Sequence, residues 1–287
     1  PPSLPGAIKS TGVSWSGCFS EILYREAQED ESIVAITAAM ASGTKLEKFI
    51  EDFPERSIDT GIAEAHAVTM AGGLQAAGAK PVVLIYSTFL QRAYDSIMHD
   101  VCLQKGCSVI FALDRAGLVG DDGPSHHGVY DVAYLRHLPE MMVLAPRDGV
   151  ELEMMFKWAL TQEHSVAFRY ARGNIPELGY NDDRPEIDAG VPEVLTQGKK
   201  VALMAYGAMV PEALVAKDLL QSEGIDATVV NMRFAKPLKA DAYKELLESH
   251  EVVVVMEDHA LMGGVGSALL EMISDHGLMS GKVIRVG

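Results

Sequence analysis

The loop DRAGLVGDDGPSHHG (residues 114–128) combines ionisable side chains with glycines directly after an apolar run. Arg115, Asp122 and the adjacent His126 and His127 all lie within it. Glycines allow a chain to turn, but a structural turn needs neither adjacent acids nor adjacent histidines. Because binding residues concentrate on loops held by a rigid scaffold, we interpret this loop as a catalytic or binding site. A metal site is less favoured, since the acids and histidines lack a recognised ligand spacing.

Glu64 lies where a predicted helix begins, in the segment DTGIAEAHAV. An acid in a first helical turn is favourable by itself, because the helix N-terminus carries partial positive charge. Amid small apolar residues, the same carboxyl group would also have a raised pKa and could exchange a proton. Both interpretations stay open from the position alone. We interpret the nearby His66 as a packed or capping residue.

Tyr86 and Phe89 flank the junction between a predicted strand and a predicted helix in YSTFLQRAYD. Aromatic rings at such a place can stack on a flat heterocycle. They can equally well pack the junction between the two elements. The sequence position favours neither interpretation.

Arg169 and Arg172 lie at the end of a predicted strand in RYARGN. The net charge of −16 repels a phosphorylated substrate at long range, so local cations must hold it. Arginine binds phosphate through two parallel hydrogen bonds, and we therefore favour a phosphate site over salt bridges to neighbouring acids. The glycines at 263, 264 and 266 lack the dinucleotide-binding spacing and predict tight packing or an interface contact instead.

Short apolar runs rich in Val and Ile alternate with longer segments of helical period, which predicts parallel sheets covered by helices. Ligands of such sheets lie beyond the carboxyl ends of the strands, where the polar clusters fall. The first predicted strands are 32–40, 80–87, 108–116, 141–147 and 165–170, with helices 62–78, 89–106 and 149–162. After a segment rich in Pro, Gly and acids, strands 200–207, 226–233, 250–258 and 282–287 alternate with helices 209–224, 240–250 and 263–277.

Composition excludes several functional classes. The 287 residues suffice for two α/β domains, and no apolar run reaches the roughly 20 residues of a membrane helix. The acidic charge argues against nucleic acid as a partner. Cys18, Cys102 and Cys107 are too few for a disulfide scaffold or a zinc site. We therefore expect a reducing compartment, most simply the cytoplasm, and packed thiols at Cys102 and Cys107.

Taken in order, these clusters resemble those of one family, 1-deoxy-D-xylulose-5-phosphate synthase, a thiamine-diphosphate enzyme related to transketolase. The resemblance runs over nearly the whole chain, and YSTFLQRAYD followed by DRAGLVGDDGPSHHG is specific to this branch. FRYARGN and EDHALMGGVGS also match. The resemblance implies a pyrimidine-binding domain with an N-terminal lead-in over 1–174, a linker over 175–190, and a transketolase C-terminal domain, shortened at its end, over 191–287.

The resemblance also implies how the cofactor is bound. Glu64 matches the glutamate that hydrogen-bonds the pyrimidine of thiamine diphosphate, and so assists catalysis through the cofactor. Phe89 matches the residue that stacks on the pyrimidine, and Tyr86 lies beside it. No metal ligand is expected in this chain, because the family binds Mg²⁺ through a GDG motif in a preceding domain. GDDG at 120–123 belongs to the substrate loop instead.

For the substrates, Asp122 and His126 match catalytic residues of the pocket, where a histidine can move a proton near neutral pH. Arg115 and Arg172 match residues that hold the substrate's phosphate, and His127 receives no role. The implied reaction condenses pyruvate with D-glyceraldehyde 3-phosphate to 1-deoxy-D-xylulose 5-phosphate and CO2, in a homodimer. Without the diphosphate- and Mg²⁺-binding domain, we expect the chain alone to be inactive. No nucleic acid or membrane partner is expected.

Two other functions stay open. The length suits a β-type subunit of a split transketolase or 2-oxoacid dehydrogenase-like thiamine enzyme, although the branch-specific strings argue against it. A non-catalytic assembly module is less favoured, because such a module has no physical need for the whole set of candidate residues.

Overall fold

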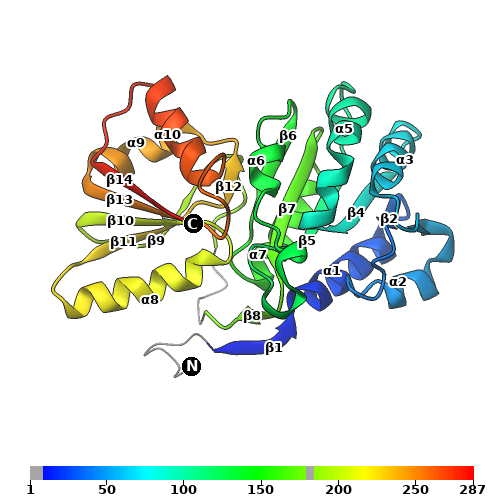
Figure 1. Cartoon of the computed structure of the whole chain (residues 1–287), viewed down its shortest axis with the longest axis horizontal. Helices are drawn as coiled ribbons and strands as arrows, with labels where there is room; N and C mark the ends of the chain where they lie inside the picture. Colours follow the sequence, from blue (N-terminus) through cyan, green and yellow to red (C-terminus); the bar gives the residue numbers. More distant parts are fainter. Residues whose placement is uncertain (1–8, 179–183) are drawn as a thin grey trace.

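The computed structural model describes residues 9–178 and 184–287. The N-terminal lead-in at 1–8 and residues 179–183 of the predicted linker lie outside the described residues. Two mostly parallel sheets, each flanked by helices, lie side by side (Figure 1). The predicted α/β fold with two successive sheets is therefore confirmed. Among the described helices, none is long and apolar enough to cross a membrane.

The larger sheet has seven strands, and every neighbouring pair except the first is parallel. Its central strands are apolar and buried on both faces, as expected for a sheet between helical layers. In spatial order the strands are β12 (Phe234–Lys236), β6 (Met141–Leu144), β7 (Ser165–Ala171), β5 (Ile110–Ala116), β4 (Lys80–Tyr86), β2 (Ile33–Thr37) and β3 (Ser57–Asp59).

β12 belongs to the second half of the chain and yet completes the first sheet, antiparallel to β6. The periodicity of the sequence did not predict it, because three residues carry no recognisable period. Arg233, with φ +55°, lies just before β12, and its carbonyl accepts a hydrogen bond from the Ala145 amide at 3.0 Å. In Figure 1 this strand lies at the boundary between the two sheets.

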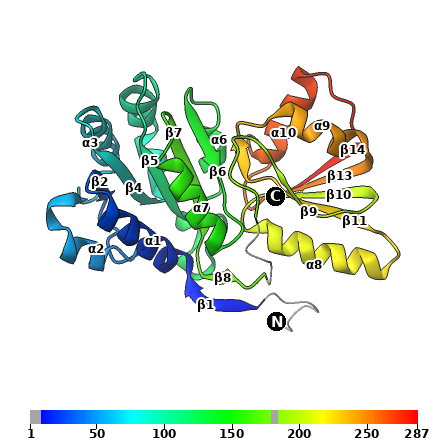
Figure 2. The same ribbon diagram turned by 180° about the vertical axis from the view of Figure 1, so that it is seen from behind.

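Helices cover both faces of the larger sheet, as Figure 2 shows from behind. On one face lie α1 (Trp15–Glu29), α2 (Glu47–Asp52) and α7 (Gly149–Ala159). The side chains of Ser14 and Asp148 cap the N-termini of α1 and α7. The other face carries α3 (Glu64–Ala76), α4 (Ser87–Leu90), α5 (Tyr94–Ser96) and α6 (Asp131–Leu135).

The predicted helix over 89–106 is not one regular helix. The segment contains α4, a 3₁₀ turn at Gln91–Ala93, α5 and a π-helical turn at Ile97–Cys102. Its apolar spacing persists throughout, because Leu90, Ala93 and Ile97 all remain buried. Apolar spacing alone therefore could not separate one continuous α-helix from a series of shorter turns.

The smaller sheet is parallel apart from one edge strand. Its order is β14 (Lys282–Val286), β13 (His250–Met256), β10 (Lys200–Ala205), β11 (Ala227–Asn231) and antiparallel β9 (Glu193–Thr196). It carries the helices α8 (Met209–Ser222), α9 (Ala240–Glu248) and α10 (Val265–Asp275). A separate pair joins β1 (Ser10–Ser14) to β8 (Asn174–Pro176), and β8 overlaps the start of the linker predicted over 175–190.

The two sheets share one buried apolar cluster. It runs from Val68 and Leu135 in the first half to Met204, Tyr206 and Leu269 in the second. Burial of apolar surface is the main favourable contribution to packing, so a shared core holds the two halves together. The shared core also helps to position the candidate site, because loops from both halves of the chain meet beneath that site.

Candidate functional site

The candidate residues gather where the central strands of the larger sheet end. Tyr86 is the last residue of β4, Arg115 lies one residue before the end of β5, and Arg172 follows β7. Since β4, β5 and β7 are parallel neighbours, their carboxyl ends share one edge. The loop after β5, with short 3₁₀ turns at Gly120–Asp122 and Pro124–His126, covers this edge.

Glu64 begins α3 and is only 4% exposed. Its Oε1 accepts a hydrogen bond from Nη1 of Arg92 at 3.1 Å, although the Arg92 side chain is 60% exposed. The same guanidinium lies 5.6 Å from the ring centre of Phe89. Arg92 therefore connects the buried carboxylate to the aromatic residue, a role that the sequence did not reveal. Its position three residues after Phe89, one helical turn away, was the available signal.

Three rings form the centre of the site. Tyr86 and Phe89 stack with centroids 5.7 Å apart and planes inclined by 19°. The His126 ring meets Phe89 edge-on, at 5.2 Å and 75°. The Arg115 guanidinium lies over the Tyr86 ring, 3.9 Å from its centre. Because burial raises the pKa of Tyr86, its hydroxyl stays protonated at neutral pH.

Asp122 holds two arginines together at the outer end of the site. Its Oδ2 lies 3.0 Å from Nε of Arg172 and 3.4 Å from Nε of Arg115. Arg115 is further fixed by donating from Nη1 to the Gly43 carbonyl at 3.1 Å. With Arg172 39% exposed, the pair offers accessible cationic donors of the kind that bind phosphate. These contacts, with Arg92 joining Glu64 to Phe89, connect the seven candidate residues Glu64, Tyr86, Phe89, Arg115, Asp122, His126 and Arg172.

Asp114, the residue before Arg115 in the chain, is completely buried. Burial raises the pKa of its carboxyl group to about 6. Its Oδ1 is 3.2 Å from Nη1 of Arg115, which partly offsets that effect. Arg115 itself holds φ +59°, a costly conformation for a residue other than glycine. Arg115 is therefore held by a strained backbone and by the buried acid next to it.

Two sequence-based interpretations are wrong. Arg169 does not join Arg172 in a phosphate site, because its side chain is 2% exposed and lies in ion pairs with Asp131 and Asp258. Side chains alternate along a strand, so residues three apart point to opposite faces. His66 is exposed on α3 rather than packed, and it does not cap this helix, whose N-cap residue is Ala63.

The glycines at 263, 264 and 266 serve tight packing, as predicted. The Glu257 carboxylate accepts hydrogen bonds from the Val265 and Gly266 amides at 2.7 and 3.0 Å. A Cβ on Gly264 would lie 2.0 Å from Oε2 of Glu257. The N-terminus of α10 is therefore occupied by a carboxylate of the chain itself. His127 also has a structural contact, since its Nδ1 accepts a hydrogen bond from the Val119 amide.

The cysteines and acids do not form a metal site within the described residues. Cys102 and Cys107 are buried and Cys18 is half-buried, and all three are free thiols. In the part of the chain that the structure describes, no group of three or more His, Cys, Asp or Glu side chains could hold a metal ion.

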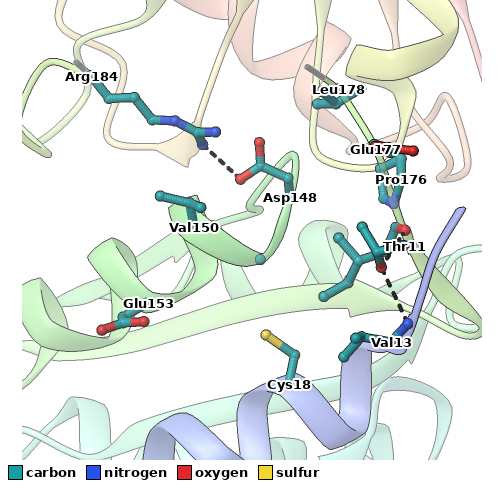
Figure 3. Close-up of a pocket in the computed structure, with 12 residues that line it drawn as sticks. Thr11, Val13, Cys18, Asp148, Val150, Glu153, Pro176, Glu177, Leu178 and Arg184 are labelled. Carbon is teal, nitrogen blue, oxygen red and sulfur yellow. Dashed lines mark hydrogen bonds and ion pairs between the residues drawn. The ribbon is translucent and has the colours of Figure 1, made fainter. Parts of the chain in front are cut away.

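A separate cavity of about 410 Å³ lies between β1, β8, α1 and α7 (Figure 3). Cys18 points into it, and Arg184 donates to Asp148 at 2.6 Å across its upper edge. None of the seven candidate residues lines this cavity. The candidate site is therefore the surface at the strand ends, and not this cavity.

Comparison with known protein families agrees with this arrangement. Residues 11–177 match the pyrimidine-binding domain of transketolase, and residues 190–287 match the transketolase C-terminal domain. The chain belongs to the transketolase family. Both matched segments contain the elements described above, with the candidate residues in the first.

Within this family, the chain is similar in sequence to curated 1-deoxy-D-xylulose-5-phosphate synthases. The chain is 49% identical over 285 residues to 1-deoxy-D-xylulose-5-phosphate synthase 1 of Geobacter sulfurreducens, covering 99% of this chain and 44% of the relative. It is 48% identical to the synthase of Heliobacterium modesticaldum, covering 96% of this chain and 42% of the relative. The chain thus spans less than half the length of these relatives.

Solved structures confirm the fold. A split-gene transketolase, described as an inactive β4 tetramer, superimposes with a TM-score of 0.85 at 33% identity, covering 96% of this chain and 89% of that one. The transketolase of Campylobacter jejuni gives a TM-score of 0.80 at 23% identity, over 97% of this chain and 43% of that one. The second likeness, at such low identity, concerns the fold alone.

Proposed function

We propose that this chain forms the pyrimidine-binding and C-terminal part of a thiamine-diphosphate enzyme that makes 1-deoxy-D-xylulose 5-phosphate and CO2 from pyruvate and D-glyceraldehyde 3-phosphate. The observation that carries the proposal is the chain of contacts from Glu64 through the aromatic rings to the arginines that Asp122 holds. Its likeness to the curated synthases supports the choice of substrates.

The residues present fit the pyrimidine of this cofactor. An aminopyrimidine offers a flat face and ring nitrogens, so it needs an aromatic neighbour and a polar group within hydrogen-bonding reach. Glu64 is a buried carboxylate whose partner Arg92 is mostly exposed and free to turn outward. Phe89 is half-buried near that arginine and can stack on the ring. When bound, thiamine diphosphate supplies the electron sink for decarboxylating a 2-oxo acid.

Glu64 and Phe89 then act by binding and orienting. The Glu64 carboxylate hydrogen-bonds the pyrimidine ring nitrogen and holds a proton there. Its burial excludes water, which strengthens such a charge-assisted bond. Phe89, backed by Tyr86, fixes the plane of the ring.

Arg115 and Arg172 bind the phosphate of the acceptor aldehyde. A phosphate dianion competes with the single carboxylate of Asp122 for their donors, because arginine prefers bidentate oxyanion partners. His126, in edge contact with Phe89, lies beside the ring site and can hold or move a proton at the reacting oxygen of the acceptor. Before the phosphate binds, Asp122 holds the two arginines together through its single carboxylate.

Other parts of the site would come from outside this chain. We propose that the ligands of Mg²⁺ and of the diphosphate lie on the N-terminal domain of the same enzyme, as a separate chain or a longer one. A homodimer is proposed by family likeness. With half of the cofactor's contacts elsewhere, the chain alone is expected to be inactive. We also propose a cytoplasmic location, in keeping with three free thiols.

A second candidate function is the β-type subunit of a split transketolase. One observation favours it, namely that the chain covers 89% of the split-gene transketolase chain at 33% identity. This candidate shares the cofactor but differs in substrates, since a transketolase moves a two-carbon unit between sugar phosphates.

The test mixes this chain with a polypeptide carrying the diphosphate domain of the Geobacter sulfurreducens relative, thiamine diphosphate and Mg²⁺. Pyruvate with D-glyceraldehyde 3-phosphate should yield 1-deoxy-D-xylulose 5-phosphate, whereas a ketose phosphate donor should yield nothing. The opposite pattern would support the split transketolase. The matching half of the relative serves as positive control. If that control is active and this chain forms neither product, both proposals fail and the non-catalytic module gains support.

A further inference from the structure

We propose that Arg169 is a positioning residue that, together with Asp258 of the second half, fixes the loop over residues 117–128. This loop carries Asp122 and His126, so the inference about turnover rests on the proposed function. The structural part of the inference, that Arg169 and Asp258 hold the base of the loop, does not depend on it.

The guanidinium of Arg169 bonds to three segments at once. Nε donates to Oδ2 of Asp131 at 2.9 Å, where α6 begins. Nη1 donates to Oδ1 of Asp258 at 2.6 Å, after β13. Nη2 donates to the Gly128 carbonyl at 3.1 Å, where the loop ends. A planar group with fixed donor directions can hold such a three-way junction in one geometry.

Gly128 is one side of the narrow base of the loop. The Gly117 amide donates to the Gly128 carbonyl at 2.8 Å, and the Gly128 amide donates to the Gly117 carbonyl at 2.9 Å. The Gly128 carbonyl therefore receives hydrogen bonds from both Gly117 and Arg169. A displacement of Arg169 would therefore disturb the two hydrogen bonds between Gly117 and Gly128 that close the loop.

The second half of the chain contacts the other side of this base. A Cβ on Gly117 would lie 2.0 Å from Oδ2 of Asp258, so this carboxylate packs directly on the glycine backbone. Gly117 also has φ +75°, which favours glycine. Just beyond the base, the Ala260 amide donates to the Val129 carbonyl at 3.0 Å. The loop is thus clamped between Arg169 and the segment that follows β13.

The clamp lies under the part of the loop that meets the candidate ligands. Toward its tip, the loop is connected to the rest of the site by the ion pairs of Asp122 and by a hydrogen bond from Thr88 Oγ1 to the Ser125 carbonyl at 3.1 Å. His126 contacts Phe89 only through its ring edge. If the base shifts, Asp122 and His126 shift with it, because the base connects the loop to the sheet.

A purely structural ion pair is the competing explanation, and the chain offers a matched control. Arg136, directly after α6, and Glu271 of α10 also join the two halves, through two hydrogen bonds of 2.6 Å. This pair does not contact Gly117 or Gly128. Asp258→Ala removes the clamp, Asp258→Asn keeps an acceptor oxygen, and Glu271→Ala breaks only the control pair.

The first readout is amide hydrogen exchange of the intact chain. In Asp258→Ala we expect loop amides, above all Gly117 and Gly128, to exchange at least about tenfold faster, with the strands of both sheets unchanged. Asp258→Asn should recover much of the protection, and Glu271→Ala should leave the loop unchanged. Unchanged loop exchange in Asp258→Ala, or equal acceleration in Glu271→Ala, would overturn the clamp.

The second readout is turnover in the reconstituted mixture described above. Misplacing catalytic groups by about 1 Å can lower rates by about a hundredfold. We therefore expect Asp258→Ala to lower kcat about ten- to hundredfold, with a smaller change in KM for the phosphorylated aldehyde. An unchanged kcat despite faster loop exchange would refute the positioning role. If even the unaltered chain gives no product, the proposed function fails, whereas the exchange experiment still decides the clamp.

Discussion

Arg169 and Arg172 stand three residues apart at the end of one strand, and both pair with aspartates, yet they occupy opposite environments. Arg169 is 2% exposed and bonded to three separate segments. Arg172 is 39% exposed and shares the single carboxylate of Asp122 with Arg115. The same residue type thus fixes the chain at one position and stays accessible to a ligand at the other.

The difference follows from the energetics of burial. Removing charges from water is costly, so a buried arginine persists only where several acceptors satisfy its donors. The carboxylates that pair with a buried arginine in turn need its positive charge to remain buried and ionised. An exposed ion pair gains little and is screened by salt, so an incoming phosphate can replace its carboxylate at small cost. Accessibility and the number of fixed partners, and not the presence of an arginine, distinguish structural from ligand-binding positions.

The largest expected effect concerns folding stability. Arg169→Met would leave Asp131 and Asp258 without their cation, and removing one partner of a buried pair typically costs about 3–5 kcal/mol. Arg172→Met should change the free energy of unfolding by less than about 1 kcal/mol. Urea unfolding of the two variants measures both values. If both variants lost the same free energy of unfolding, the proposed difference between a structural Arg169 and a ligand-binding Arg172 would be wrong.

The second expected effect concerns substrate binding. Loss of a charged hydrogen bond costs about 1.5–3 kcal/mol, so Arg172→Met should raise KM for the phosphorylated aldehyde about ten- to hundredfold in the reconstituted mixture. KM for pyruvate should change little. Arg25→Met, which breaks another partly exposed ion pair, with Glu153, serves as the matched control. An unchanged KM for the aldehyde would exclude Arg172 from the phosphate site.

The smallest expected effect concerns pH. The pKa of Asp114 is raised from 3.8 to about 6 in the fold, so its contribution to stability is present below pH 3.8 and is lost as pH rises through 6. Asp114→Asn should therefore gain stability relative to the unaltered chain between about pH 4 and 7, on the order of 1–3 kcal/mol. Thermal unfolding across this range measures the gain. Asp218→Asn, at an exposed position, serves as the control and should show no such gain with pH. A stability difference between Asp114→Asn and the unaltered chain that stays the same at every pH would contradict the burial argument.

The sequence predicted the meeting of the seven candidate residues because it predicted the strands that precede them. Strand ends of a parallel sheet share an edge, so Tyr86, Arg115 and Arg172 had to come close together. The position of Glu64 followed in the same way from the start of α3. Their roles in binding and catalysis stay predictions.

The sequence could not separate Arg169 from Arg172, because the decisive partner of Arg169, Asp258, is 89 residues away in the chain. For the same reason, the clamp on Gly117 and the insertion of β12 into the first sheet were not predictable. Both depend on how the second half packs against the first. Local periodicity carries no information on such distant pairings.

We propose that Glu64 binds the pyrimidine of thiamine diphosphate and thereby enables turnover. The most direct test of this proposal compares the unaltered chain with Glu64→Gln, each mixed with the diphosphate-domain polypeptide, by the rate of 1-deoxy-D-xylulose 5-phosphate formation. We expect this rate to fall at least about a hundredfold in Glu64→Gln, with unchanged thermal unfolding. A Glu64→Gln chain that forms product at nearly the unaltered rate would contradict the proposal.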